Sequence, residues 1–403
     1  MKVLHLLKTS RGERWASSQA RVLSQRGVEV HAALPDLDGS VADEWISNGA
    51  HVSCLPYSLS LAHPNATRLS ILAIRRLVDR IQPDLVHAHS VKAATLARLA
   101  LRKHSGLPRI FQVPGPLHLE STLFRNAELS ITTADDYWIA TSKAIRSLYV
   151  TGGVSPDRVF LSYAGTDNSG FREPRSGWLR KRLGIPDDEF IVGNASYIYS
   201  PKWYLFQKRG LKCHEDLIDG ISLASIRDPS IRGVLIGGPW GPNGAYFETV
   251  RRYAAERSRG RVLMPGFMTL QEIALAMPDF DCVAHVPSSE NCGGVVEPLL
   301  CGIPTIATRI GGLPEVIMDG HTGMTVPVHS PEAIGEAILT LRNDYEVLRA
   351  RAMTGRRLVE TMFDARRTAV EVHEIYRVIL GERRCPPVDF DSQLFLQGIP
   401  TSR

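Results

Sequence analysis

Short apolar runs alternate along the chain with longer segments in which apolar residues recur every three or four positions. The short runs are typical of strands buried on both faces, and the longer segments are typical of amphipathic helices. The strands expected in the first part of the chain are 2–7, 28–34, 51–57, 84–90, 109–114, 138–142 and 159–165, with helices that include 15–26, 68–82 and 91–104. This alternation predicts a parallel sheet covered by helices on both faces.

The same pattern begins again after residues 165–188, a stretch rich in glycine, proline, aspartate and arginine that reads as a linker. The second set of expected strands is 190–198, 231–238, 261–267, 281–288, 305–311 and 324–327. The helices expected with them are 212–227, 244–258, 293–301, 331–342 and 347–363, and a last helix, 365–380, precedes a polar tail.

The fold class predicted from these two sets is α/β, with two doubly wound Rossmann-like domains that face each other across a cleft. We expect the first domain at 1–170 and the second at 171–363. Residues 364–403 are expected to form a helix that returns toward the first domain, followed by the tail. In such domains ligands bind at the carboxyl ends of the strands, so the site must be sought there.

Size and composition favour a globular protein. A chain of 403 residues, 44% hydrophobic and 22% charged, is long enough for two cores. It contains no apolar run of the roughly 18 residues that a membrane-spanning helix needs. The first residues read as a strand rather than a signal peptide, and the six cysteines include no Cys-x-x-Cys pair. These features predict a cytoplasmic protein with reduced thiols, without structural zinc or disulfides.

The net charge of +5 suits an anionic ligand such as a nucleotide diphosphate, or weak attraction to an anionic membrane. No aromatic-interleaved basic stretch indicates nucleic-acid binding. Segment 68–80, where arginines alternate with leucine and isoleucine, could touch the inner face of a membrane peripherally, or could be an ordinary packed helix.

The segment 287–304 carries the clearest chemistry. Gly293 and Gly294 follow an expected strand and leave backbone N–H groups uncovered near a helix start, where a phosphate is favoured. Glu290 and Glu297 flank this turn, so one carboxylate could hold sugar hydroxyls and the other ribose hydroxyls. The alternative is a glycine-rich helix entry with two incidental surface acids.

This segment resembles the signature of the retaining GT-B glycosyltransferases of family 4: Pro-Ser, a glutamate, a glycine turn, a second glutamate, then Cys-Gly-x-Pro. The resemblance implies that Glu297 binds the ribose and Glu290 the donor sugar. Six residues separate the two acids here, whereas the family has seven, and Ser289 stands at the strict family spacing. The donor contacts that the resemblance implies in this turn are Asn291, Cys292, Gly293, Gly294 and Val295.

Other stretches resemble the same family between about residues 2 and 380. Residues 211–218 match its lysine-bearing helix start, which implies that Lys212 neutralises the departing diphosphate. Arg209, or else Lys202, stands where the family has an arginine. Phe267 is the last residue of an expected strand, and the resemblance implies that the backbone at this strand end contacts the nucleobase. Residues 311–317 match the family's loop after the next strand.

In the first domain the resemblance implies that Gly12 belongs to a glycine loop and that His89 faces the donor sugar. Because alternate strand residues share a face, His87 and His89 could also form a metal pair. No third ligand is evident near them, so no metal is expected, and a satisfied core histidine is a further alternative. His118 and Glu120 are acceptor candidates by position alone.

Competing motifs are absent from the sequence: no Gly-x-Gly-x-x-Gly follows a strand, and no phosphate-loop Gly-Lys-Ser/Thr exists. Asp279 and Asp281 mimic a metal-holding acid pair but stand at the entrance of a buried strand, which favours a structural role.

The resemblance implies a retaining, metal-independent enzyme that moves a hexosyl-type sugar from a UDP- or GDP-sugar to a hydroxyl of a glycan, lipid or small natural product. Glu290, His89 and Lys212 are the expected catalytic residues, and the nucleotide sugar is a co-substrate rather than a bound cofactor. The alternatives are a nucleotide-sugar epimerase or phosphorylase of the same fold, or a non-catalytic nucleotide-sugar-binding module.

Overall fold

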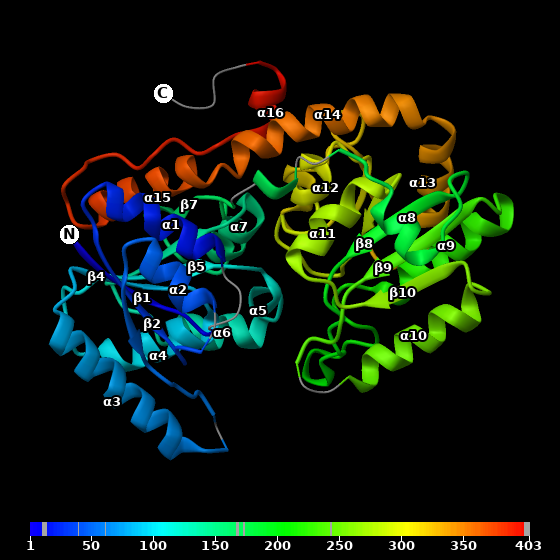
Figure 1. Cartoon of the computed structure of the whole chain (residues 1–403). Helices are drawn as coiled ribbons and strands as arrows, with labels where there is room; N and C mark the ends of the chain where they lie inside the picture. The colour runs from blue at the N-terminus through cyan, green and yellow to red at the C-terminus, as the bar shows by residue number, and fades with distance from the viewer. Residues whose placement is uncertain are drawn as a thin grey trace. The chain divides into compact units, whose positions relative to one another are not determined.

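The computed structural model describes residues 1–9, 14–38, 40–60, 62–166, 169–171, 174–241 and 244–398 (Figure 1). The chain divides into two compact units. Unit 1 comprises Met1–Asp167 and Met362–Arg403, and unit 2 comprises Asn168–Thr361.

The centre of unit 1 is a seven-stranded parallel sheet with the strand order β3-β2-β1-β4-β5-β6-β7. The first strand, β1, pairs with both β2 and β4, and this places His5 directly beside His87. The strands are β1 Lys2–Leu6, β2 Glu29–Leu34, β3 His51–Cys54, β4 Leu85–Ala88, β5 Arg109–Val113, β6 Asp136–Ala140 and β7 Val159–Leu161.

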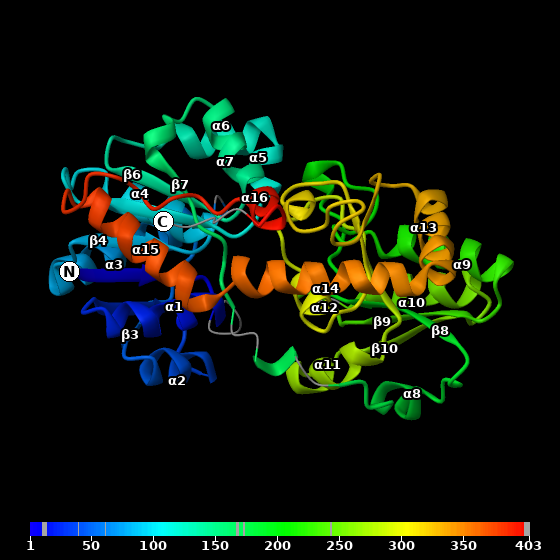
Figure 2. The ribbon, with the colours of Figure 1, turned by 90° about the horizontal axis from the view of Figure 1, so that it is seen from above.

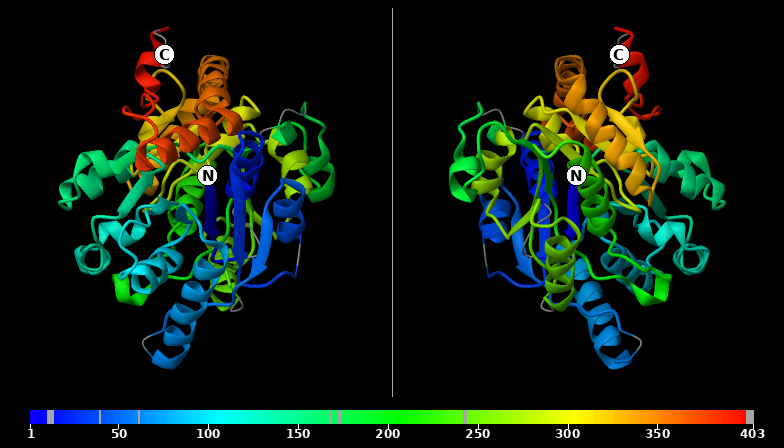
Figure 3. Two further views of the ribbon diagram at one scale, coloured as in Figure 1. Left: turned by 90° about the vertical axis from the view of Figure 1, so that its left-hand side faces the viewer. Right: turned by 90° about the vertical axis from the view of Figure 1, so that its right-hand side faces the viewer.

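Helices bury both faces of this sheet, because successive strand residues point to opposite sides. Leu4 and Leu6 lie in the core under α3, α4 and α7, whereas Val3 and Leu7 lie in the core under α1, α2 and α15 (Figure 3). The helices are α1 Arg14–Gln25, α2 Ser40–Ser47, α3 Pro64–Ile81, α4 Val91–Leu101, α5 Leu117–Glu120, α6 Thr122–Ser130, α7 Lys143–Thr151, α15 Ala365–Ile379 and α16 Ser392–Leu396.

Unit 2 repeats the plan with a six-stranded parallel sheet in the order β10-β9-β8-β11-β12-β13. Its strands are β8 Phe190–Ala195, β9 Ile231–Ile236, β10 Val262–Gly266, β11 Cys282–His285, β12 Thr305–Thr308 and β13 Met324–Val326. Its helices are α8 Trp178–Leu183, α9 His214–Arg227, α10 Ala245–Arg257, α11 Leu270–Ala276, α12 Val296–Leu300, α13 Pro331–Asn343 and α14 Tyr345–Met362. The predicted pair of doubly wound Rossmann-like domains is therefore confirmed.

The end of the chain packs onto unit 1. Helix α15 lies beside α1 (Figure 2). Beyond it, Phe390 is buried against Tyr163 and Arg367, and Lys143 Nζ lies 2.8 Å from Asp391 Oδ2. The sequence pattern predicted only a polar tail here, and a single buried aromatic residue was too weak a signal to place it.

Helix α3 is a packed surface helix. Ile74 and Leu77 are buried in the core, and Arg75 Nε donates to Ala100 O at 2.6 Å, whereas Leu69 is exposed. No helix among the described residues is long and apolar enough to cross a membrane. Peripheral membrane contact through this helix stays a prediction.

The short helix α8 lies inside the stretch expected to be a linker, and Asp279 holds its start. The backbone N–H groups of Gly177 and Leu179 donate to the two Asp279 oxygens at 2.8 and 2.7 Å. Asp281 binds Arg175 and Arg180 at 2.9 and 3.0 Å. Both carboxylates therefore have structural partners, as their place at the strand entrance indicated.

We expect Asp279→Ala to lower the free energy of unfolding by roughly 2–3 kcal/mol, because two N–H groups then lose their acceptor in a buried place. Chemical denaturation monitored by tryptophan fluorescence measures this. The exposed Glu256→Ala on α10 is the control and should shift stability by less than about 0.5 kcal/mol. Equal stabilities of the two variants would contradict this account of α8.

Candidate active site

Glu290 occupies the centre of the candidate site, in the loop between β11 and α12. Its Oε2 accepts from His285 Nε2 at 3.0 Å and forms an ion pair with Lys212 Nζ. Its Oε1 accepts from the backbone N–H of Asn291 at 3.0 Å. The structure thus brings together Glu290 and Lys212, which lie 78 positions apart in the sequence.

The charge of Glu290 depends on these neighbours. Burial alone would raise the pKa of Glu290, but Lys212 and His285 more than offset it and lower the pKa to about 2. The carboxylate is therefore ionised at neutral pH and can only accept hydrogen bonds. Glu290 thereby contacts both the Lys212 ammonium and the His285 ring at the end of β11.

Two buried histidines lie in this part of unit 2, and the sequence motifs did not single out either. His285 contacts Glu290 directly, whereas His214 is affected by the charge of Lys212. Burial lowers the pKa of His285, and burial together with Lys212 and His285 lowers the pKa of His214 to about 3. His214 Nε2 lies 3.1 Å from Ser196 Oγ, which itself donates to Asn194 at 2.7 Å. Only their positions in the sequence could have indicated these two residues, because His285 ends the strand β11 and His214 begins the helix α9.

Glycines let the loop close around Glu290. Gly294 has a positive φ of 71°, and a Cβ there would lie 2.4 Å from the His285 ring. Gly311 also has a positive φ, and a Cβ there would lie 1.8 Å from the Glu290 carbonyl oxygen. No other residue fits either position without displacing the site.

Glu297 lines a cavity of about 170 Å³, together with residues that include Ala195, Leu270 and Gly294. No other side chain among the described residues hydrogen-bonds its carboxylate. Burial, and secondly the charge of Glu290, raise the pKa of Glu297. Ligand pockets usually exceed about 300 Å³, so this cavity suits one part of a ligand only.

The helix after the glycine turn is one turn long, Val296–Leu300, and not the longer helix expected at 293–301. A helix this short has little macrodipole, so an anion here would rely on individual N–H groups and on Lys212. Gly293 is exposed, whereas the side chains of Cys292 and Val295 are buried.

Exposed aromatic rings lie near the site. Phe267 is 62% exposed, and its ring centroid lies 6.3 Å from that of Tyr197. Tyr199 stacks on Trp240 at 5.2 Å. Burial, and then the charges of Glu290 and Tyr197, raise the pKa of Tyr199 to about 12. The sequence reading did not select Tyr199.

Arg209 is directed toward α9. It forms ion pairs with Asp216 and, at 3.7 Å, with Asp219. It also lines a cavity of about 610 Å³ together with Ser288 and His329. The backbone N–H of the alternative, Lys202, donates to Gln207 Oε1 at 3.1 Å. Lys212 is thus the cation that contacts Glu290.

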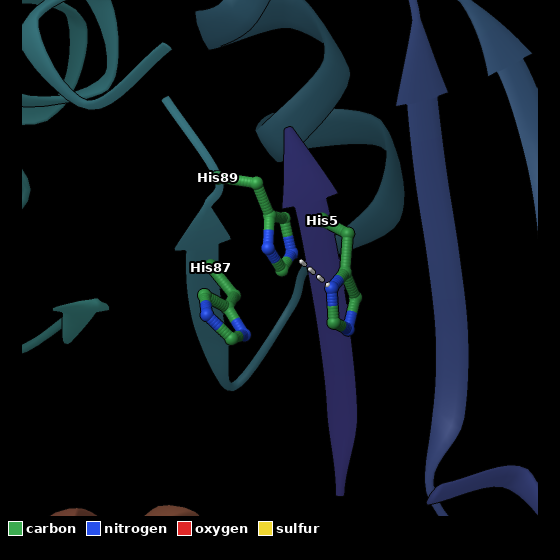
Figure 4. Close-up of side chains that lie close together, drawn as sticks. All are labelled: His5, His87 and His89. Carbon is green, nitrogen blue, oxygen red and sulfur yellow. Dashed lines mark hydrogen bonds between the residues drawn. The ribbon is translucent and has the colours of Figure 1, made fainter. Parts of the chain in front are cut away.

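In unit 1, His89 is fully buried beside His5 and His87 (Figure 4). His118 Nε2 lies 3.0 Å from Glu128 Oε2, and His118 and Arg98 lower the pKa of Glu128 to about 2 against the opposing effect of burial. Glu120 is exposed at the end of α5.

The roles assigned to these unit 1 residues stay predictions. Gly12 lies outside the described residues.

Two parallel α/β units, one with an ionised glutamate held at the end of a central strand, define a two-domain protein of the GT-B fold. The family model described as Glycosyltransferase Family 4 matches residues 12–169, and the model described as Glycosyl transferases group 1 matches 206–357. The chain belongs to the family 4 glycosyltransferases, as its sequence motifs predicted.

Among curated proteins, the chain is 30% identical over 258 residues to a D-inositol 3-phosphate glycosyltransferase of Corynebacterium glutamicum, covering 61% of this chain and 58% of that protein. It is 24% identical over 392 residues to the enzyme of that name from Acidothermus cellulolyticus, covering 91% and 85%. The match to a third such protein, from Thermomonospora curvata, spans about half of that relative's length.

Among solved structures, Anabaena Alr3699/HepE in complex with UDP-glucose has a TM-score of 0.77 at 20% identity, covering 93% of this chain and 99% of that one. Sucrose-phosphate synthase from Thermosynechococcus elongatus has a TM-score of 0.75 at 18% identity, covering 95% and 100%. These likenesses show the shared fold.

We expect Gly294→Ala to destabilise the protein by roughly 2 kcal/mol or more, because the added methyl meets the His285 ring and the backbone φ is unfavourable. Gly293→Ala is the matched control, since its Cβ would have only Glu290 Oε1 within 4 Å, at 3.8 Å. Thermal unfolding of both variants measures the difference. If Gly293→Ala were the more damaging change, the described loop would be wrong.

Proposed function

We propose that the chain transfers a sugar from a nucleotide diphosphate sugar to a hydroxyl group of an acceptor, with retention of the anomeric configuration and without a divalent metal. The observation that carries the proposal is the contact of Lys212 and His285 with the ionised Glu290, beside the glycine turn of unit 2. The names of the similar proteins support glycosyl transfer, and the UDP-glucose complex of a structural neighbour supports a nucleotide-sugar donor.

In the proposed complex the diphosphate contacts the Lys212 ammonium and the N–H groups of the turn at 293–295. Glu290 Oε2 now accepts from both Lys212 and His285, so a bound sugar hydroxyl would compete for the carboxylate. Glu297 would accept from ribose hydroxyls, and its position on the wall of the cavity of about 170 Å³ supports this role. The remaining nucleotide would lie toward the exposed Phe267.

The chemistry breaks the bond between the anomeric carbon and the diphosphate oxygen, and that oxygen keeps the electron pair. Lys212 stabilises the charge that develops on it, which lowers the barrier without a cation. The acceptor oxygen attacks from the face that the diphosphate leaves, and its proton passes to a diphosphate oxygen. Glu290 then positions and polarises the sugar without forming a covalent bond.

The direct test incubates the purified chain with UDP-, GDP- and ADP-sugars, with and without acceptors that include D-inositol 3-phosphate. Slow release of free nucleotide that an acceptor accelerates supports transfer, and the product's anomeric configuration tests retention. A new nucleotide sugar formed without acceptor would indicate an epimerase, and phosphate-dependent cleavage a phosphorylase. Tight binding without turnover would indicate a non-catalytic module.

The absence of a metal requirement is tested by adding a chelator. If the chelator abolished turnover and magnesium or manganese restored it, the metal-free mechanism would be contradicted.

Lys212→Ala should lower donor turnover by roughly 100-fold or more, since one preorganised charge contact is worth about 3 kcal/mol in a transition state. Steady-state rates at saturating donor measure this. Lys181→Ala, which removes an exposed lysine of α8, is the control and should leave the rate unchanged. A normal rate in Lys212→Ala would instead assign the role to Arg209 or Lys202.

The two glutamates should differ in their kinetic effects. Glu290→Gln should depress kcat strongly while nucleotide diphosphate still binds, because its contact matters mainly in the transition state. Glu297→Gln should weaken both nucleotide diphosphate and donor, with a smaller change in kcat. Calorimetric binding and initial rates separate the two effects.

Normal turnover of Glu290→Gln together with a defect in Ser289→Ala would show that the register of the first acid is wrong. If neither glutamate affected binding or turnover, the site itself would be wrong.

A further inference from the structure

Three histidines converge inside unit 1, on the sheet face that α1, α2 and α15 cover (Figure 4). His5 lies on β1, His87 lies beside it on β4, and His89 follows the end of β4. All three are fully buried, and one ring nitrogen from each lies within 4.8 Å of the others. The sequence reading dismissed a metal here because it saw no third ligand, and the pairing of β1 with β4 supplies it.

The hydrogen bonds of this cluster are incomplete. His5 Nδ1 lies 2.8 Å from His89 Nε2, and His87 Nδ1 lies 2.5 Å from the Tyr376 hydroxyl. The buried Gln112 side chain also lies near His87 and acts on it as a hydrogen-bonding group that raises the pKa against the larger effect of burial. His5 Nε2, His87 Nε2 and His89 Nδ1 are buried without a partner, as is the Trp45 indole N–H beside His5. Buried polar atoms almost always have partners, so three unpartnered imidazole nitrogens in one cluster require an explanation.

We propose that His5, His87 and His89 form a binding site for one transition-metal ion of the zinc class. Three imidazole nitrogens with an open fourth position are an established zinc ligand set. Imidazole without thiolate or carboxylate suits zinc, cobalt, nickel or copper and disfavours magnesium and calcium. This assignment goes beyond the proposed transfer reaction, and it replaces the role at the donor sugar that the resemblance implied for His89, whose side chain is fully buried.

The protonation state suits metal binding. Burial lowers the pKa of His5 to about 3 and lowers the pKa values of His87 and His89 well below the usual 6.5. The imidazoles are therefore neutral at physiological pH, and each has a lone pair to give.

The geometry requires a modest adjustment. Zinc–nitrogen bonds of about 2.0–2.1 Å in a tetrahedron place the ligand nitrogens about 3.4 Å apart. The ligand atoms now lie within 4.8 Å of one another, so some pairs must approach by up to about 1.4 Å. Rotations of the three rings would bring the nitrogens to that separation.

A second shell is already in place. Tyr376, from α15, contacts His87 Nδ1, and such partners orient a metal-binding imidazole and fix its tautomer. Trp15 and Trp45 pack against His89 and His5, with ring centroids 5.1 and 5.4 Å away, and shield the site from water. An ion here would join β1, β4 and α15, segments far apart in the sequence, so its expected role is to stabilise unit 1.

Because the cluster is fully buried, the ion must enter during folding. The test therefore refolds the whole chain from guanidinium with one equivalent of Zn²⁺ or Co²⁺ and then removes loose metal by gel filtration. Bound metal per chain is measured by mass spectrometry, d–d absorption reports Co²⁺ geometry, and thermal unfolding reports stability. Nucleotide release from a donor sugar is followed separately, so failure of this proposal is distinguishable from failure of the transfer proposal.

Four variants assign the site. His5→Gln removes one ligand, and Tyr376→Phe removes only the second-shell hydroxyl while keeping the ring. His51→Gln is the control, since His51 lies beside a single other histidine, His31, with ring centroids 4.9 Å apart. His329→Gln tests the other group of metal-type side chains, Cys213, Asp216 and His329 in unit 2.

We expect about one ion per chain in the native sequence, a tetrahedral Co²⁺ spectrum and a higher Tm with metal. His5→Gln should retain less than a tenth of that metal, and Tyr376→Phe should bind roughly 10- to 100-fold more weakly. His51→Gln and His329→Gln should bind as the native sequence does. Metal-free native protein after refolding would overturn the proposal, as would undiminished metal in His5→Gln or Tyr376→Phe, or loss of metal in His329→Gln. If His5→Gln fails to fold, Tyr376→Phe decides.

Discussion

Parallel pairing constrains both sheets, because two parallel strands cannot be joined by a tight turn and need a crossover of a dozen or more residues. Each crossover returns over a sheet face, so helices cover both faces and the central strands β1, β4, β5 and β11 are buried, whereas the edge strand β3 is partly exposed. All the carboxyl ends then open at one edge of each sheet. Glu290 follows β11 and His89 follows β4, so both candidate residues result from this one constraint.

Burying a charged carboxylate at such an edge costs free energy unless a cation and hydrogen-bond donors lie beside it. Glu290 has both in Lys212 and His285, and without them burial would favour the neutral acid. The close approach of the loop in turn requires Gly294 and Gly311. The same carboxylate raises the pKa values of Glu297 and Tyr199, so a ligand that changes the charge at Glu290 would be felt at both neighbours.

Unit 1 meets the burial of polar groups in two ways. The Glu128 carboxylate, with Arg98 and His118, forms a network in which charges balance. The cluster of His5, His87 and His89 instead stays neutral and leaves nitrogen atoms without partners. The first arrangement is complete as a structural element. The histidine cluster has nitrogen lone pairs that could bind an ion. The Glu128 network has its hydrogen bonds satisfied and the histidine cluster does not, and this difference distinguishes a structural network from a candidate binding site.

The sequence by itself predicted the strands found among the described residues and the two-domain α/β class, because buried parallel strands and amphipathic helices have distinct apolar periods. Its motifs also selected Glu290 and Lys212, which the structure brings into contact, while their roles stay predictions. It did not reveal α8 or the packing of Phe390, since short helices and single aromatic residues have no period. The contact of His285 with Glu290, five positions further along, depends on the conformation of the turn after β11, which residue types alone do not reveal. The position of His5 beside His87 was decided only by tertiary structure. The reason is physical: strand pairing joins residues about 80 positions apart, and no local pattern encodes which strands become neighbours.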